Sequence, residues 1–72
     1  MKEFKFELKD QEFIEMIKVL KIFKLVGSGG EAKLRIENGE SIRNGEIELR
    51  KRAKLRDGDV IEFDGNKIIV VK

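Results

Sequence analysis

The sequence of 72 residues predicts a small α+β domain: an N-terminal strand, two short helices, then three to four mostly antiparallel strands. Three observations lead to this prediction. An apolar pattern of period two opens the chain, an apolar stripe at helical spacing follows it, and Asn-Gly and Asp-Gly pairs punctuate the second half. The length allows one domain, which we expect to span residues 1–72.

The first two elements follow from these periodicities. Phe4, Phe6 and Leu8 alternate with charged residues, which is typical of a strand with one buried face. Asp10 is expected to cap the next helix, because its carboxylate can accept the free backbone N–H groups of a first turn. The apolar stripe of that helix comprises Phe13, Ile14, Met16, Ile17, Val19, Leu20, Ile22 and Phe23.

A second short helix is predicted from about Gly29 to Asn38. Ser28 and Glu31 have the S-x-x-E spacing of a capping box, and Gly39 suits a left-handed helix stop. A strand is the competing interpretation, since apolar and basic residues alternate over residues 32–36. The cap and the glycine stop favour the helix.

The second half of the chain carries turn and strand signals. Asn44-Gly45 is the strongest short hairpin signal, because both residues tolerate the positive φ of a tight turn. Two Asp-Gly pairs repeat this chemistry, and segments rich in Val and Ile flank the second pair. We therefore predict turns at residues 57–58 and 64–65, and strands at residues 60–63 and 68–71.

Positive charge is concentrated in the middle of the chain. Residues 33–56 carry eight Lys or Arg against four Glu, whereas residues 1–32 sum to zero and residues 57–72 to −2. Such a local excess is a cue for a polyanionic partner. The densest part has five cations among the seven residues 50–56, which repel one another unless anions lie close. A solvated loop paired with nearby acidic residues explains that run equally well.

Several classes of function are disfavoured by composition. Without Cys or His, the chain cannot form a disulfide, a zinc finger or a His-based metal site. Ser28 and Ser41 are the candidate nucleophiles, and no base is evident beside either. The Gly27–Gly30 segment lacks the Lys-Ser/Thr of a nucleotide P-loop, so we favour a structural turn, whose amides could also meet a phosphate. We therefore expect no catalytic residue and no cofactor.

Nothing in the sequence predicts membrane insertion or export. No segment approaches the roughly 20 apolar residues needed to span a bilayer. The first residues alternate charge with Phe and offer no apolar signal-peptide core. We expect a cytoplasmic protein without a membrane partner.

The order and spacing of these motifs resemble the S4-type RNA-binding domain, also called the αL motif. The resemblance covers about residues 12–64, and one position departs from it: Gly29 stands where many members have Arg after the capping Ser. The strand at residues 3–8 and the basic run add a likeness to short bacterial proteins that consist of this domain alone. The matching positions are Ser28, Ala32-Lys33, Gly39, Ile42-Arg43-Asn44-Gly45 and Gly58-Asp59-Val60-Ile61.

The resemblance implies an RNA-binding protein, associated with the ribosome or with translation, whose second helix and hairpin form one positive face. Structured RNA such as ribosomal or transfer RNA is the implied partner. Side chains cannot enter the deep major groove of an RNA helix, so contacts should fall on phosphates and 2′-hydroxyls. With no Tyr or Trp, and every Phe on a predicted core pattern, base stacking should rest on Arg. The implied RNA-binding residues are Lys33, Arg43, Asn44, Gly45, Arg50, Lys51, Arg52 and Lys54.

Two alternatives from other classes remain open at this point. A ubiquitin-like or sulfur-carrier β-grasp protein would suit residues 55–63, but it needs a Gly-Gly tail and a hairpin before its helix, whereas this chain ends Val70-Val71-Lys72. A protein-binding module, in the form of a homodimer or a complex with a ribosomal partner, could use Leu34 and the Phe strand. This second alternative is compatible with RNA binding.

Overall fold

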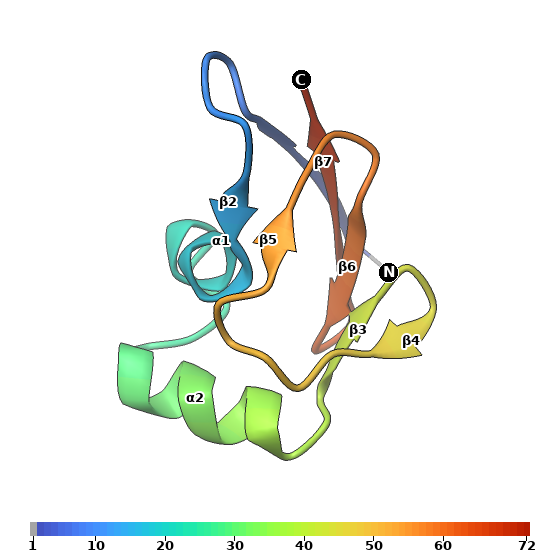
Figure 1. The fold of residues 1–72 in the computed structure, drawn as a ribbon. Helices are drawn as coiled ribbons and strands as arrows, with labels where there is room; N and C mark the ends of the chain where they lie inside the picture. The colour runs from blue at the N-terminus through green and yellow to red at the C-terminus, as the bar shows by residue number, and fades with distance from the viewer. Residues whose placement is uncertain (1) are drawn as a thin grey trace.

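A five-stranded sheet forms one side of the computed structural model, which describes residues 2–72, and both helices lie on its other side (Figure 1). The strand order is β1-β7-β6-β3-β4, with β1 and β7 parallel and the other neighbours antiparallel. A separate two-stranded ladder joins β2 to β5. The elements are β1 (Lys2–Glu7), β2 (Ile14–Glu15), α1 (Met16–Ile22), α2 (Gly29–Glu37), β3 (Ser41–Arg43), β4 (Glu46–Ile47), β5 (Lys54–Leu55), β6 (Val60–Phe63) and β7 (Asn66–Val71).

The sheet and the helices enclose one hydrophobic core. Alternate residues of β6 and β7 face it, as the period-two pattern of a sheet with one buried face requires. Its buried members include Met16, Val19, Leu20, Ala32, Ile36, Leu55, Ile61, Phe63, Ile68 and Val70. Over residues 2–72, no helix has the length and apolar character needed to cross a membrane.

The predicted fold class is confirmed, with two additions. Five strands follow the helices instead of three to four. Two of them, β4 and β5, are only two residues long, too short to give a pattern in the sequence. In the described part of the chain, the two strands before α1 do not pair with each other: β1 pairs with β7 and β2 with β5. The hairpin that a β-grasp protein needs before its helix is therefore not formed here, and that alternative is wrong.

The second helix confirms the capping-box prediction. The Ser28 hydroxyl accepts the N–H of Glu31 at 3.1 Å, and the N–H of Gly27 donates to the Glu31 carboxylate at 2.8 Å. Gly39 ends the helix with a φ of +81°, which glycine adopts without steric cost. The competing strand over these residues is wrong. The helical arrangement leaves Leu34 63% exposed on the solvent side.

The start of the first helix differs from the prediction. α1 begins at Met16, and Asp10 lies in the preceding loop, where it caps nothing. Glu15 is the N-cap residue and makes no side-chain capping bond. The N–H groups of the first two helical residues donate instead to the carbonyl oxygens of Ala53 and Lys51, at 3.0 and 2.9 Å. The helix is therefore capped by a segment distant in sequence, a contact that no local pattern indicates.

Two of the three predicted glycine turns are hairpins. The φ angles of Asn44-Gly45 are 50° and 86°, and those of Asp64-Gly65 are 50° and 77°, as a type I′ turn requires. The pair Asp57-Gly58 differs. It joins β5 to β6, which belong to different sheets, and only its glycine has a positive φ. That pair is a turn between layers, because β5 is drawn away to pair with β2.

Candidate nucleic-acid interface

The strongest concentration of positive charge lies around one concavity. Residues 50–56, called the basic segment below, follow β4 after two intervening residues and include β5 (Figure 1). They border a hollow of about 730 Å³. Three predicted residues lie outside its lining: Lys33 is exposed on α2, and Asn44 and Gly45 form the hairpin turn. The lining residues are Arg43, Arg50, Lys51, Arg52, Ala53, Lys54 and Arg56.

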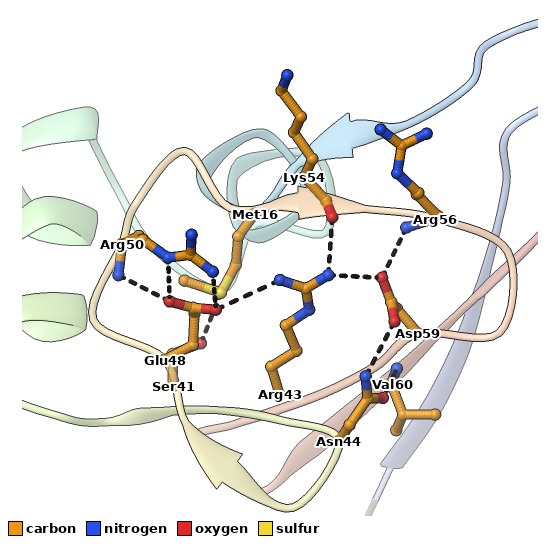
Figure 2. A network of polar contacts seen from close by, with 10 residues as sticks. All are labelled: Met16, Ser41, Arg43, Asn44, Glu48, Arg50, Lys54, Arg56, Asp59 and Val60. Carbon is orange, nitrogen blue, oxygen red and sulfur yellow. Dashed lines mark hydrogen bonds and ion pairs between the residues drawn. The ribbon is translucent and has the colours of Figure 1, made fainter.

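Arg43 is held inside this structure by three acceptors. One terminal nitrogen, Nη2, donates to the Lys54 carbonyl at 2.9 Å and to Asp59 Oδ2 at 3.0 Å, while Nη1 donates to Glu48 Oε1 at 3.4 Å (Figure 2). Only 23% of its side chain is exposed. Two carboxylates already balance its charge, so Arg43 ties the β3–β4 hairpin to β5 and the loop before β6.

Asn44 is similarly committed to the fold. Its Nδ2 donates to Asp59 Oδ1 at 2.9 Å, and its Oδ1 accepts the N–H of Val60 at 2.9 Å. The Asn-Gly turn and the Gly-Asp-x-Ile segment, two motifs of the family resemblance, thus bind each other through these side chains. The two motifs occur together because they form one hydrogen-bonded cluster around Asp59, called the Asp59 cluster below.

Asp59 is the central acceptor of this cluster. It also accepts the N–H of Arg56 at 2.7 Å. Burial of the carboxylate acts to raise its pKa, but the donors from Arg56, Asn44 and Arg43 outweigh it, so that the pKa of Asp59 lies below its usual value. These donors therefore favour the charged carboxylate, which holds the Asn44 turn and the Arg43 guanidinium in place.

Glu48 compensates a second Arg of the concavity. Its carboxylate accepts Arg50 Nε at 3.0 Å, Arg50 Nη2 at 3.2 Å and the Arg50 backbone N–H at 3.2 Å. Hydrogen bonds from Arg50, together with the Arg43 guanidinium, lower the pKa of Glu48 from 4.5 to about 2. Arg43 and Arg50 are thus formally balanced by Glu48 and Asp59. Arg35 in α2 is likewise paired with acidic residues, at 2.9 to 3.5 Å.

The remaining cations of the basic segment have no such partners. Among residues 2–72, no carboxylate lies within ion-pairing distance of Lys51, Arg52, Lys54 or Arg56. Lys54 and Arg56 lie instead over the ring of Phe13, at 5.0 and 5.6 Å from its centroid. Arg56 was not among the residues predicted for RNA binding, although its i,i+2 spacing from Lys54 in a strand could have indicated a shared face.

The low pKa of Glu48 predicts a pH dependence of stability. A carboxyl whose pKa is lower in the folded state stabilises the fold above its unfolded pKa, and this stabilisation is lost as the pH falls from 4.5 towards about 2. The wild-type protein should lose unfolding free energy as the pH falls through this window. In Glu48→Gln, which has no carboxyl to protonate at this position, we expect that loss to be smaller by about 1–2 kcal/mol, allowing for solvent screening. Urea denaturation of both proteins between pH 2 and pH 7 measures the difference. Parallel curves would contradict the assigned pairing.

One relative of the chain matches it over nearly its whole length and has the same fold. YbcJ of Escherichia coli strain K12, named as a candidate RNA-binding protein, is 33% identical over 66 residues, which cover 92% of this chain and 94% of YbcJ. The solution structure of YbcJ, described as revealing an αL motif involved in RNA binding, matches with a TM-score of 0.72 and 32% identity. That match covers 94% of this chain and 86% of the YbcJ structure.

A second relative and a family model agree with this comparison. RlbA of Bacillus subtilis strain 168, whose name suggests a role in ribosome maturation, is 38% identical over 56 residues, covering 78% of this chain and 79% of RlbA. The family model described as S4 domain matches residues 6–71. These matches confirm the αL fold predicted from the motifs, and the chain belongs to the S4 domain family.

Proposed function

We propose that this protein binds structured RNA through the concave surface bordered by the basic segment. The observation that carries this proposal is the separation of its cations into two groups. Arg43 and Arg50 are balanced by carboxylates and shape the surface. Lys51, Arg52, Lys54 and Arg56 gather at the same hollow, have no carboxylate partner among residues 2–72, and supply the positive potential.

RNA suits this surface better than a small anion does. The hollow is open and spread over seven residues of two segments, so that it matches several phosphates along a backbone. Arg side chains bind phosphate in a bidentate manner, and Lys supplies a mobile point charge. Membership of the S4 domain family and the RNA-binding description of YbcJ support this choice of partner.

Ribosomal RNA is the RNA class that we favour, with transfer RNA as the other candidate of the same kind. The name of RlbA, which refers to ribosome maturation, supports a role at the ribosome. The cytoplasmic location expected from the sequence is part of this proposal. The activity we propose is binding alone. Both candidate nucleophiles serve the fold: Ser28 caps α2, and the buried Ser41 hydroxyl donates to the Met16 sulfur at 3.1 Å.

The proposal assigns different roles to the residues predicted from the sequence. Lys51, Arg52 and Lys54 contact phosphates, and Arg56 joins them. Arg50, which Glu48 balances, lies at the rim with 74% of its side chain exposed. Arg43, Asn44 and Gly45 build the hairpin and hold the segment in place. Lys33, exposed on α2, extends the positive surface only for an RNA large enough to reach it.

Salt dependence tests whether phosphates dominate the binding. With four or five phosphates engaged, log K against log salt concentration should have a slope of about −3 to −4.5, since each contact contributes roughly 0.7–0.9. Fluorescence anisotropy with a labelled hairpin from ribosomal RNA, from 50 to 300 mM KCl, measures this slope. Removing two contacts in Lys51→Glu/Arg52→Glu should make the slope shallower by about 1.4–1.8. A wild-type slope near zero would refute phosphate binding at this surface.

A further inference from the structure

We propose that Phe13, together with Lys54 and Arg56, forms a stacking site for an unpaired base beside the basic surface. The preferred ligand would then be an RNA helix that carries a single-stranded nucleotide next to the bound backbone. This inference rests on the proposed function, because the base belongs to the RNA that the concavity binds.

The β2–β5 ladder places these three side chains together. Ile14 pairs with Leu55, and both are buried, at 5% and 0% exposed. Because side chains alternate across a strand, their neighbours Phe13, Lys54 and Arg56 lie on the opposite, outer face of the ladder. Figure 2 shows Lys54 and Arg56 pointing to the same side, away from Arg43. Both cations also line the concavity, so the outer face of the ladder is continuous with the proposed RNA surface.

Phe13 differs from the other Phe residues of the chain. Phe63 belongs to the buried core, and Phe4, Phe6 and Phe23 pack against it, whereas Phe13 is half-buried outside that cluster. The expectation that every Phe serves the core is therefore wrong for Phe13. Its ring is the aromatic surface available beside the free cations, in a chain without Tyr or Trp.

The contacts of the ring indicate how a nucleotide would bind. Lys54 Nζ lies 5.0 Å and Arg56 Cζ 5.6 Å from the ring centroid, within the range of cation–π attraction. Both side chains are exposed and flexible, so a base can take their place on the ring. The displaced ammonium and guanidinium groups then bind the phosphates on either side of that base. Aromatic stacking combined with flanking cations is a common way of binding single-stranded RNA.

The first test compares a blunt RNA hairpin with the same hairpin carrying three unpaired adenosines at its 5′ end, at its 3′ end or in a bulge. We expect the wild-type protein to bind at least one of the extended RNAs about tenfold more tightly than the blunt one. Phe13→Leu keeps the charges and an apolar side chain, and should abolish this preference while leaving affinity for the blunt hairpin unchanged. Thermal denaturation checks that the variant folds.

The outcomes separate this inference from the function on which it rests. If the wild-type protein binds none of these RNAs, the proposed function fails and the stacking site with it. If it binds all the RNAs equally, or if Phe13→Leu keeps the preference, the stacking site alone is refuted.

A spectroscopic test follows the ring directly. Phe13→Trp introduces the single Trp of a chain that has neither Trp nor Tyr. Stacking of a base should quench its fluorescence by about half or more with the extended RNA, and much less with the blunt hairpin. Ile22→Trp, at a position 52% exposed on α1, is the matched control and should respond to neither RNA. Equal quenching of both Trp variants would overturn the assignment.

Discussion

The double substitution Lys51→Glu/Arg52→Glu is expected to weaken RNA binding by about a hundredfold or more while leaving the protein folded. Each lost charge-assisted contact is worth about 1.5 kcal/mol or more, and two such losses correspond to at least two decades of affinity. The fold should survive because neither side chain has an ion-pair partner among residues 2–72. The Lys51 carbonyl, which accepts the first-turn N–H of Ile17, is unaffected by a change of side chain.

A matched control separates local contacts from net charge. Lys2→Glu/Lys5→Glu changes the formal net charge by the same amount, from +2 to −2, but at two exposed residues of β1. β1 is the edge strand at the opposite end of the sheet from β4, which leads into the basic segment. This control should retain affinity within a few-fold of wild type. Equal losses in both variants would show that RNA responds to overall charge, and the assigned surface would be abandoned.

Arg43→Ala is expected to cost about 2–3 kcal/mol of unfolding free energy, lowering the melting temperature by about 10–20 °C. The substitution leaves Asp59, whose side chain is 16% exposed, without its guanidinium partner, and removes one donor from the Lys54 carbonyl. Arg43→Lys should recover only part of the loss, because an ammonium cannot reproduce a planar fork that reaches three acceptors. Differential scanning calorimetry measures both variants.

The control for this experiment is Arg52→Ala, which removes an exposed cation with no ion pair among the described residues. Its stability should lie within about 0.5 kcal/mol of wild type. Should Arg43→Ala instead melt like wild type and lose RNA binding, Arg43 would be a direct RNA contact, as the sequence resemblance implied. From the structure we expect instead that Arg43→Ala lowers stability and that its effect on RNA binding is secondary.

Elements set by local chemistry were predicted well. The second helix was placed within one residue at its end, since Ser28, Glu31 and Gly39 carry its start and stop signals in neighbouring positions. The two type I′ hairpins were found for the same reason, because a turn with two positive φ angles selects its own residues. In these cases the interacting groups are three or four positions apart.

Elements set by distant contacts were not. α1 was expected to start after Asp10, but Ile14 and Glu15 extend to pair with β5, and the first-turn N–H groups find carbonyls in the basic segment. This pairing also moved Phe13 out of the apolar stripe. Helical spacing alone could not show this, because a strand pair that precedes a helix shifts the face on which every earlier residue lies.

The sequence by itself determined the fold class, the local turns and caps, and a basic segment of five cations, because each depends on residues close together in the chain. The pairing of Arg50 with Glu48 is also local, since the two residues are two positions apart. Only the tertiary structure decided the role of Arg43, because folding brings its guanidinium within 3.0 Å of the Asp59 carboxylate, sixteen residues along the chain. A cation that pairs with a carboxylate in the folded protein stabilises the fold and is less available to bind a phosphate, which a count of charges along the sequence does not show.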